Sequence, residues 1–291
     1  MLDIFCQIDD FVKYLRKNNE LKILLKGIKN QRSRDSRLTL SERMTILVLF
    51  HQSRYRDFKS FYLLHVCTHL RKEFPQLISY SQYVSLMPKT LMGLVYFLDS
   101  KLGKSTGISF VDSTSIKVCH SKRASRNKIF SGLAKKGRTT MGWIYGFKLH
   151  FVINDQGEII SYCLTPANTD DRSPLLALAK KLWGKLLGDK GYICKKKSEM
   201  LRKKGVQLIT AVRSNMKNRL MPYMDKILLR KRFLIETIND LLKNQLQIEH
   251  TRHRSPTNFL VNLVSGLIAY AFSAKKPALN INHMGQRMIA A

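Results

Sequence analysis

Acidic residues are scarce in this chain of 291 residues: Asp and Glu number 20 against 51 Lys and Arg, a formal net charge of +31. The positive charge is spread along the chain and is not confined to a tail. A field of this kind attracts phosphate backbones and releases their counterions on binding. The excess therefore indicates a polyanionic partner, with nucleic acid as the main candidate and an anionic membrane surface as the alternative.

Long apolar stretches are also absent. No run reaches the roughly 18 residues needed to span a bilayer, and the N-terminus lacks the basic start and apolar run of a secretory signal. Apolar residues make up 44% of the chain, and its length permits a substantial core in one large domain or two modest ones. We therefore expect a globular, cytoplasmic protein that does not enter a membrane.

Cysteine usage excludes two further classes of protein. The five cysteines are scattered, odd in number and form no Cys-x-x-Cys pair. Neither a disulfide framework nor a structural zinc site is therefore expected. Cys67 and His69 could act as metal ligands, although such a pair inside a helical pattern is more typical of an ordinary helix.

Residues 1–100 show helical patterns separated by short breaks. Residues 39–42 read Thr-Leu-Ser-Glu, a capping box before an apolar run, and further helices are predicted at 58–69 and 83–99. Short helices joined by short turns are typical of a helix-turn-helix-like DNA-binding region, and equally of a plain helical bundle.

From about residue 105 the pattern changes to strands mixed with helices. Strands are predicted at 107–115, 145–154, 158–165, 185–188 and 206–212, and helices at 171–181, 195–204, 231–244 and 260–272. A basic, turn-rich segment fills residues 117–138. A hairpin followed by alternating strands and helices predicts an α/β fold, a mixed sheet covered by helices. We expect residues 105–275 to form this domain and residues 276–291 to form a loose tail.

Three of the few acids stand in apolar surroundings. Asp112 ends the run Gly-Ile-Ser-Phe-Val-Asp, Asp189 follows Lys-Leu-Leu-Gly, and Glu236 lies in the helical segment Phe-Leu-Ile-Glu-Thr-Ile. Because residues at strand ends converge at one edge of such a sheet, we expect these carboxylates to meet. Carboxylates are the hard oxygen ligands that Mg²⁺ prefers. Two such ions roughly 3.5–4 Å apart can perform phosphoryl transfer.

Each of these acids has a simpler alternative, which is a solvated or capping carboxylate. Asp170, Asp171, Asp240 and Glu249 compete for the same role. Asp171 is better explained as a helix cap, because Ser-Pro follows shortly after it. Asp240 lies one turn beyond Glu236.

Four motifs occur in a fixed order along the second part of the chain. They are Phe-Val-Asp-Ser-Thr at 110–114, Tyr-Gly-Phe-Lys-Leu-His at 145–150, Leu-Gly-Asp-Lys-Gly-Tyr at 187–192, and the spacing Arg-x3-Glu-x6-Lys from Arg232 to Lys243. Together they resemble the motifs of DDE-type transposases of bacterial insertion sequences, whose catalytic fold is ribonuclease-H-like. The resemblance spans about residues 105–270 and is greatest to the insertion-sequence family numbered nine-eight-two. One departure is Leu229, which stands where the family often has a Tyr.

The resemblance implies an enzyme that hydrolyses DNA at the element's ends, its terminal inverted repeats, and then joins a 3′-hydroxyl to target DNA. It implies two Mg²⁺ ions, with Mn²⁺ as a possible substitute, held by Asp112, Asp189 and Glu236. It also implies a homo-oligomer, at least a dimer on DNA, acting at the bacterial nucleoid. A nuclease without strand transfer and a non-catalytic DNA-binding protein derived from a transposase stay open as alternatives.

Basic residues near the motifs are candidate DNA contacts. Arg232 and Lys243 lie at helical offsets from Glu236 that predict one shared face, where they either hold phosphates or form an ion pair. Lys148 and His150 share one face of their strand, turned toward the active site or the DNA, unless His150 is an ordinary buried histidine. The remaining candidates are Lys190, Lys122, Arg123 and Arg126.

Overall fold

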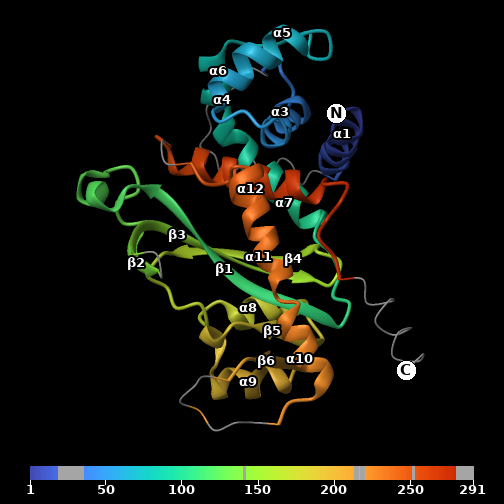
Figure 1. Ribbon diagram of the computed structural model, residues 1–291. Coiled ribbons are helices and arrows are strands. Elements are labelled where there is room, and N and C mark those ends of the chain that lie inside the picture. The colour runs from blue at the N-terminus through green and yellow to red at the C-terminus, as the bar shows by residue number, and fades with distance from the viewer. Residues whose placement is uncertain (19–35, 140–141, 213–215, 217–219, 251–252, 280–291) are drawn as a thin grey trace. The chain divides into compact units, whose positions relative to one another are not determined.

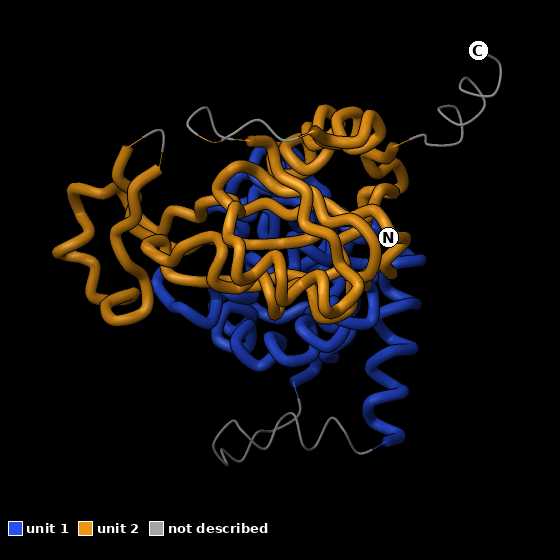
Figure 2. The backbone as a smooth tube through the Cα atoms, turned by 90° about the horizontal axis from the view of Figure 1, so that it is seen from below, with its two compact units in different colours: residues 1–101, 241–273 blue, residues 102–240, 274–291 orange. Residues whose placement is uncertain are grey.

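A computed structural model describes residues 1–18, 36–139, 142–212, 216, 220–250 and 253–279. The chain forms two compact units (Figure 2). The first, here called the helical unit, consists of Met1–Lys101 and Leu241–Ser273; the second, the sheet unit, consists of Leu102–Asp240 and Ala274–Ala291.

These units differ from the predicted division of the chain. The predicted domain of residues 105–275 includes 241–273, which belong to the helical unit in the structure. Within the predicted tail, residues 280–291 lie outside the described residues.

The helical unit is all-helical, as the N-terminal sequence predicted. Its longer helices are α1 (Leu2–Lys17), α3 (Leu40–Gln52), α7 (Leu91–Ser100) and α12 (Pro256–Ala271). Its shorter segments are α4 (Phe58–Ser60), η1 (Phe61–Val66), α5 (Cys67–His69), α6 (Tyr80–Leu86), η2 (Met87–Thr90) and η6 (Leu241–Gln245). α1 packs against α3, and α12 packs against α3 and α7. The capping box at the start of α3 is confirmed, because the Thr39 side chain accepts from the Glu42 N–H and the Glu42 carboxylate accepts from the Thr39 N–H.

The sheet unit is built on a mixed sheet (Figure 1). Its strands are β1 (Ile108–Cys119), β2 (Lys135–Thr139), β3 (Gly142–Asn154), β4 (Ile159–Pro166), β5 (Gly184–Gly188) and β6 (Val206–Thr210). β3 runs antiparallel to β1, and β2 and β4 pair with successive parts of its other edge. β5 pairs parallel with β1, and β6 pairs parallel with β5. An antiparallel hairpin continued by parallel strands beyond β1 is the ribonuclease-H-like arrangement, so the predicted fold class is confirmed.

Helical segments cover this sheet. They are η3 (Ser121–Arg126), α8 (Leu175–Leu178), η4 (Ala179–Lys181), η5 (Lys190–Tyr192), α9 (Lys195–Arg202), α10 (Tyr223–Arg230) and α11 (Phe233–Asp240). Val111 and Val152 pack in one core cluster with Leu175 of α8 and Leu201 of α9. Since side chains alternate along a strand, Asp112 lies on the opposite side of β1 from Val111. α11 contacts β1, and an α11 side chain bonds to Asp112 on that side.

Three elements differ from the sequence prediction. β1 continues to Cys119, so Asp112 lies inside the strand and not at its end. β2 falls in the segment predicted to be turn-rich; its sequence Lys-Lys-Gly-Arg-Thr has the charges that are common on edge strands. α10 lies between the strand predicted at 206–212 and the helix predicted at 231–244, where no element was predicted. None of the described helices has the length and apolar character needed to cross a bilayer.

Candidate active site

Asp112 is a half-enclosed carboxylate on the α11 side of β1. Its side chain is 20% exposed, and one oxygen accepts a hydrogen bond of 3.0 Å from the Asn239 amide of α11. Burial raises the pKa of the Asp112 carboxyl to about 6, and the Glu236 and Asp189 charges add to the rise. The Ser113 backbone N–H and Arg232 act in the opposite direction. The carboxylate is therefore costly to ionise here, a cost that a nearby cation would offset.

Asp189 directly follows the last residue of β5. β5 ends at Gly188, and the Asp189 side chain caps η5 by accepting 2.7 Å from the Lys190 backbone N–H. Both Asp189 and Lys190 are exposed. The second predicted acid thus lies at the end of a parallel strand next to β1, as the sequence indicated.

Glu236 lies in the first turn of α11 and is 55% exposed. The Arg232 guanidinium donates to it over 2.6 Å, and another nitrogen of the same group lies 4.0 Å from Asp112. Arg232 therefore links two of the three predicted acids. The predicted Arg232–Glu236 proximity on one helical face is present in the structure.

Asn239 is a site residue that the sequence reasoning missed. Its Nδ2 donates to Asp112, while its buried Oδ1 has no hydrogen-bond donor among the described residues. Asn239 follows Glu236 by three residues, so the two lie on one helical face. That spacing was the available signal, but an amide in a helix is too common to stand out alone.

Asp189 and Glu236 both lie near Asp112, but the three carboxylates do not form a closed ligand set. Both Asp189 and Glu236 are near enough to raise the pKa of Asp112. Within the described part of the chain, no group of three or more His, Cys, Asp or Glu side chains is placed to hold a metal ion. The pair Cys67 and His69 is therefore not part of such a group. The Arg232 guanidinium pairs with Asp112 and Glu236 in this arrangement. We call Asp112, Asp189 and Glu236 the carboxylate site.

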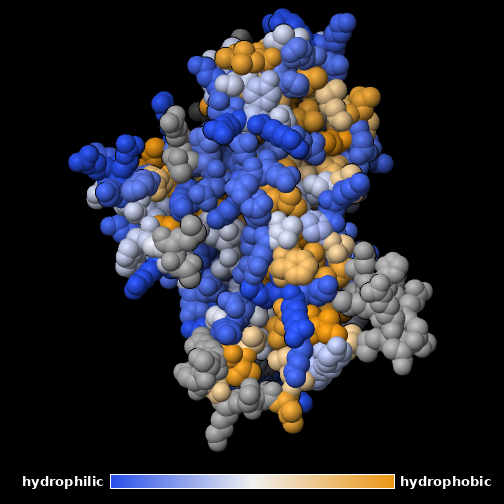
Figure 3. Space-filling view, viewed as in Figure 1, coloured by the Kyte–Doolittle hydropathy of each residue, from blue (hydrophilic) through white to orange (hydrophobic). Residues whose placement is uncertain are grey.

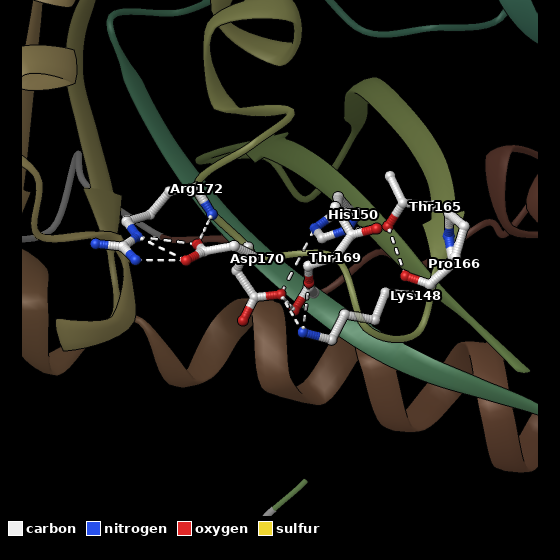
Figure 4. Close-up of polar contacts among 9 residues, drawn as sticks. Lys148, His150, Thr165, Pro166, Thr169, Asp170 and Arg172 are labelled. Carbon is white, nitrogen blue, oxygen red and sulfur yellow. Dashed lines mark hydrogen bonds and ion pairs between the residues drawn. The ribbon is translucent and has the colours of Figure 1, made fainter. Parts of the chain in front are cut away.

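A second polar group lies on the other side of β1 (Figure 4). The Asp171 carboxylate accepts 2.9 Å hydrogen bonds from Ser113 of β1 and from Lys148 of β3, and Lys148 also donates to the Thr169 carbonyl over 3.0 Å. His150 is fully buried, with one nitrogen 2.8 Å from the Thr165 hydroxyl and the other 3.9 Å from Asp171. We call Ser113, Lys148, His150 and Asp171 the Asp171 cluster.

The Asp171 cluster corrects two expectations. Asp171 caps no helix: α8 starts after Pro174, and the carboxylate bonds to two strands instead. Lys148 is 16% exposed and its amino group is bonded inside the unit, which makes it a poor phosphate contact as placed. Burial lowers the pKa of His150 to about 4, against the raising effect of Asp171, so this histidine is neutral near pH 7.

Two of the other competing acids are paired with basic residues. Asp170 is paired with Arg172. Glu249 lies 3.4 Å from Lys243, and both belong to the helical unit. α11 ends at Asp240 and the π-helical η6 follows, so the predicted regular helix over 231–244 is interrupted before Lys243.

The segment from η3 to the end of β2, residues 121–139, is here called the basic arm. Lys122, Arg123 and Arg126 are exposed on η3, and Arg138 of β2 is exposed opposite Trp143 of β3. Trp143 is itself 62% exposed. Figure 3 shows mainly hydrophilic side chains over the part of the sheet unit that carries η3.

Comparison with known proteins identifies a family for this chain. A family model described as "Transposase DDE domain" matches residues 102–256, more than half of the chain. Among solved structures, the chain is similar to one described as a piggyBac transposase synaptic complex with hairpin DNA. That likeness has 10% identity and a TM-score of 0.42, and it covers 98% of this chain and 82% of the other. No curated protein sequence matches the chain.

Proposed function

Because this chain belongs to the transposase DDE domain family, we propose that it cleaves DNA at the ends of an insertion sequence and transfers the 3′-hydroxyl ends into target DNA. The observation that carries the proposal is that acids from β1, the end of β5 and α11 lie close together: Asp112 and Glu236 share Arg232 as a partner, and Asp189 lies near Asp112. These are separate elements of one sheet unit, as a shared metal site requires.

The donors of the carboxylate site fit divalent metal ions. Asp112, Asp189 and Glu236 supply hard oxygens, and the orphaned Oδ1 of Asn239 is a further oxygen beside Asp112. Two Mg²⁺ ions, for which Mn²⁺ is a substitute, would activate a water or 3′-hydroxyl and stabilise the leaving oxygen. In this proposal Asp112, Asp189 and Glu236 would hold the two ions. Arg232 would then release Glu236 and turn to a DNA phosphate.

The basic arm is the proposed DNA-binding surface. Its exposed cations Lys122, Arg123 and Arg126 can neutralise backbone phosphates. Trp143 offers an exposed aromatic ring beside Arg138, a combination suited to stacking on a base. Lys190 and Lys243 are the remaining proposed phosphate contacts.

The wider assignment follows the sequence resemblance. We infer terminal inverted repeats and target DNA as partners, a homo-oligomer of at least two chains on DNA, and action in a bacterial cytoplasm. The same resemblance supports the insertion-sequence family numbered nine-eight-two. The N-terminal helices are inferred to contribute DNA binding.

The test compares Asp189→Asn with Asp170→Asn, since Asp170 is an exposed acid already paired with Arg172. Purified protein is given labelled DNA from the region flanking its gene, a target plasmid and Mg²⁺. We expect cleavage and joining by the parent and by Asp170→Asn, and neither by Asp189→Asn, with DNA binding retained by all three.

Two outcomes of the same assay support the alternatives. Cleavage without joined products indicates a nuclease that lacks strand transfer. DNA binding without any metal-dependent cleavage by the parent indicates a non-catalytic DNA-binding protein. Unchanged cleavage by Asp189→Asn contradicts the assignment of Asp189.

A further inference from the structure

Asp171 ties three parts of the sheet unit together. Its carboxylate accepts from Ser113 on β1 and Lys148 on β3, each over 2.9 Å. Lys148 also donates to the Thr169 carbonyl, so the segment after β4 is held against both strands. Figure 4 shows Lys148 and His150 directed toward this segment.

Ser113 connects this cluster to the carboxylate site. It is the next residue after Asp112 on β1, and its hydroxyl donates to the Asp171 carboxylate over 2.9 Å. Because the peptide bond links Ser113 to Asp112, the hydrogen bond from Ser113 to Asp171 also restrains the backbone at Asp112.

Tyr192 belongs to η5, which Asp189 caps, and lies near the Asp171 cluster. It lies three residues after Asp189 and its side chain is buried. Burial raises the pKa of the Tyr192 hydroxyl, and the Asp112 and Asp171 carboxylates are the next largest causes, so the hydroxyl lies near both acids. The cluster thus adjoins the elements that carry two of the three proposed ligands.

We propose that Asp171 is a positioning residue for the carboxylate site: through Ser113 it fixes the backbone and orientation of Asp112. The inference rests on the proposed function, since it assumes that Asp112 binds metal. Groups that orient a metal ligand through a hydrogen bond affect metal affinity without touching the ion. Asp171 acts one residue away from Asp112, through its bond to the Ser113 hydroxyl.

The composition of the cluster argues against a role in stability alone. Lys148 is 16% exposed and Asp171 is 34% exposed, so part of the hydration of both charges is lost. Apolar side chains of similar volume often replace such a pair with neutral or favourable effect on stability. The hydrogen-bonded ion pair of Lys148 and Asp171 holds the two side chains in one orientation, whereas two apolar side chains would not be held in this way.

The experiment measures Mn²⁺ binding to the full-length protein without DNA, by calorimetry or electron paramagnetic resonance. We expect Asp171→Asn to weaken Mn²⁺ binding by about tenfold or more, and Asp170→Asn to leave it unchanged. Lys148→Arg keeps the ion pair and is expected to bind Mn²⁺ like the parent, while Lys148→Met is expected to reproduce Asp171→Asn.

A double variant, Lys148→Met with Asp171→Leu, separates positioning from stability. It leaves no unpaired charge, so its thermal unfolding temperature is expected to lie near the parent's while Mn²⁺ binding stays weak. Parental Mn²⁺ affinity in Asp171→Asn or in this double variant overturns the inference. Asp189→Asn shows which idea has failed: if it binds Mn²⁺ normally, the proposed metal site is wrong; if it alone loses Mn²⁺, only the role of Asp171 is wrong.

Discussion

Asp112 and Ser113 are neighbours on β1, yet they belong to polar groups of opposite character. On the α11 side, Asp112 is a carboxylate whose pKa rises to about 6 through burial and the nearby acids. On the other side, Asp171 is matched by Lys148 and by the Ser113 hydroxyl. The carboxylate site holds an excess of negative charge, whereas the Asp171 cluster is internally balanced. We propose on this basis that the first receives a cation and that the second holds its surroundings in place.

The largest expected effect is on catalysis through Glu236. Glu236→Gln keeps the side-chain volume but removes a charged oxygen ligand, so we expect cleavage to fall at least about a hundredfold. Glu249→Gln is the matched control, because Glu249 pairs with Lys243 in the helical unit. Cleavage kinetics at saturating Mg²⁺ measure both variants. Equal activity in the two would remove Glu236 from the carboxylate site.

Asn239 comes next. Asn239→Ala removes the amide that donates to Asp112 and the orphaned oxygen beside it. We expect Mn²⁺ affinity to fall by about ten- to a hundredfold, measured by titration calorimetry. Thr237→Ala serves as control, because Thr237 is on the same helix and its hydroxyl donates to the Phe233 carbonyl. A normal Mn²⁺ affinity in Asn239→Ala would limit the amide to a packing role.

Asp112 should reduce stability at neutral pH. Its pKa of about 6 in the folded protein exceeds the ordinary value of 3.8. The stabilisation that comes from the protonated carboxyl is therefore fully present below pH 3.8 and is lost as pH rises through 6. Asp112→Asn is therefore expected to be more stable than the parent at pH 7, by on the order of 2 kcal/mol, with no gain near pH 4. Denaturant unfolding in the absence of divalent metal, at a series of pH values, measures this. A loss of stability at pH 7 would contradict the description of this side of β1.

His150 should show the opposite pH dependence. Its pKa is lowered from 6.5 to about 4, so its contribution to stability is present above pH 6.5 and is lost as pH falls toward 4. Between roughly pH 6 and pH 5, the parent's free energy of unfolding should fall by about 1 kcal/mol more than that of His150→Gln. Unfolding experiments at these pH values measure the difference. His51 and His253 have pKa values lowered in the same direction, so the difference between variant and parent is the relevant quantity. An unchanged slope would show that His150 is not the buried neutral group described above.

The sequence was sufficient for the fold class because apolar periodicity and turn residues are local signals. It placed Asp189 correctly at the end of β5, where a short apolar run stops. It ended β1 too early, at residue 115, because residues 113–115 are all polar and the strand is longer than its apolar run. It missed β2 because an edge strand rich in Lys and Arg reads as a loop.

The partners of individual side chains could not be read from the sequence. Asp171 followed by Ser-Pro has the pattern of a helix cap, but its partners Ser113 and Lys148 are distant in sequence and become neighbours only through the pairing of β1 with β3. Asn239 and Arg232 converge on Asp112 for the same kind of reason, since α11 packs on β1. Periodicity predicts which face a residue occupies, while the identity of its partner depends on the tertiary fold.

The central claim is that Asp189 binds metal directly, and a change of ligand atom tests it. A thiolate is a softer ligand than a carboxylate and is poorly suited to Mg²⁺, whereas Mn²⁺ tolerates it better. The measurement is DNA cleavage by Asp189→Cys in Mg²⁺ and in Mn²⁺, each relative to the parent. Direct coordination predicts loss of cleavage in Mg²⁺ with clear recovery in Mn²⁺; equal loss in both metals, or equal activity in both, would contradict it.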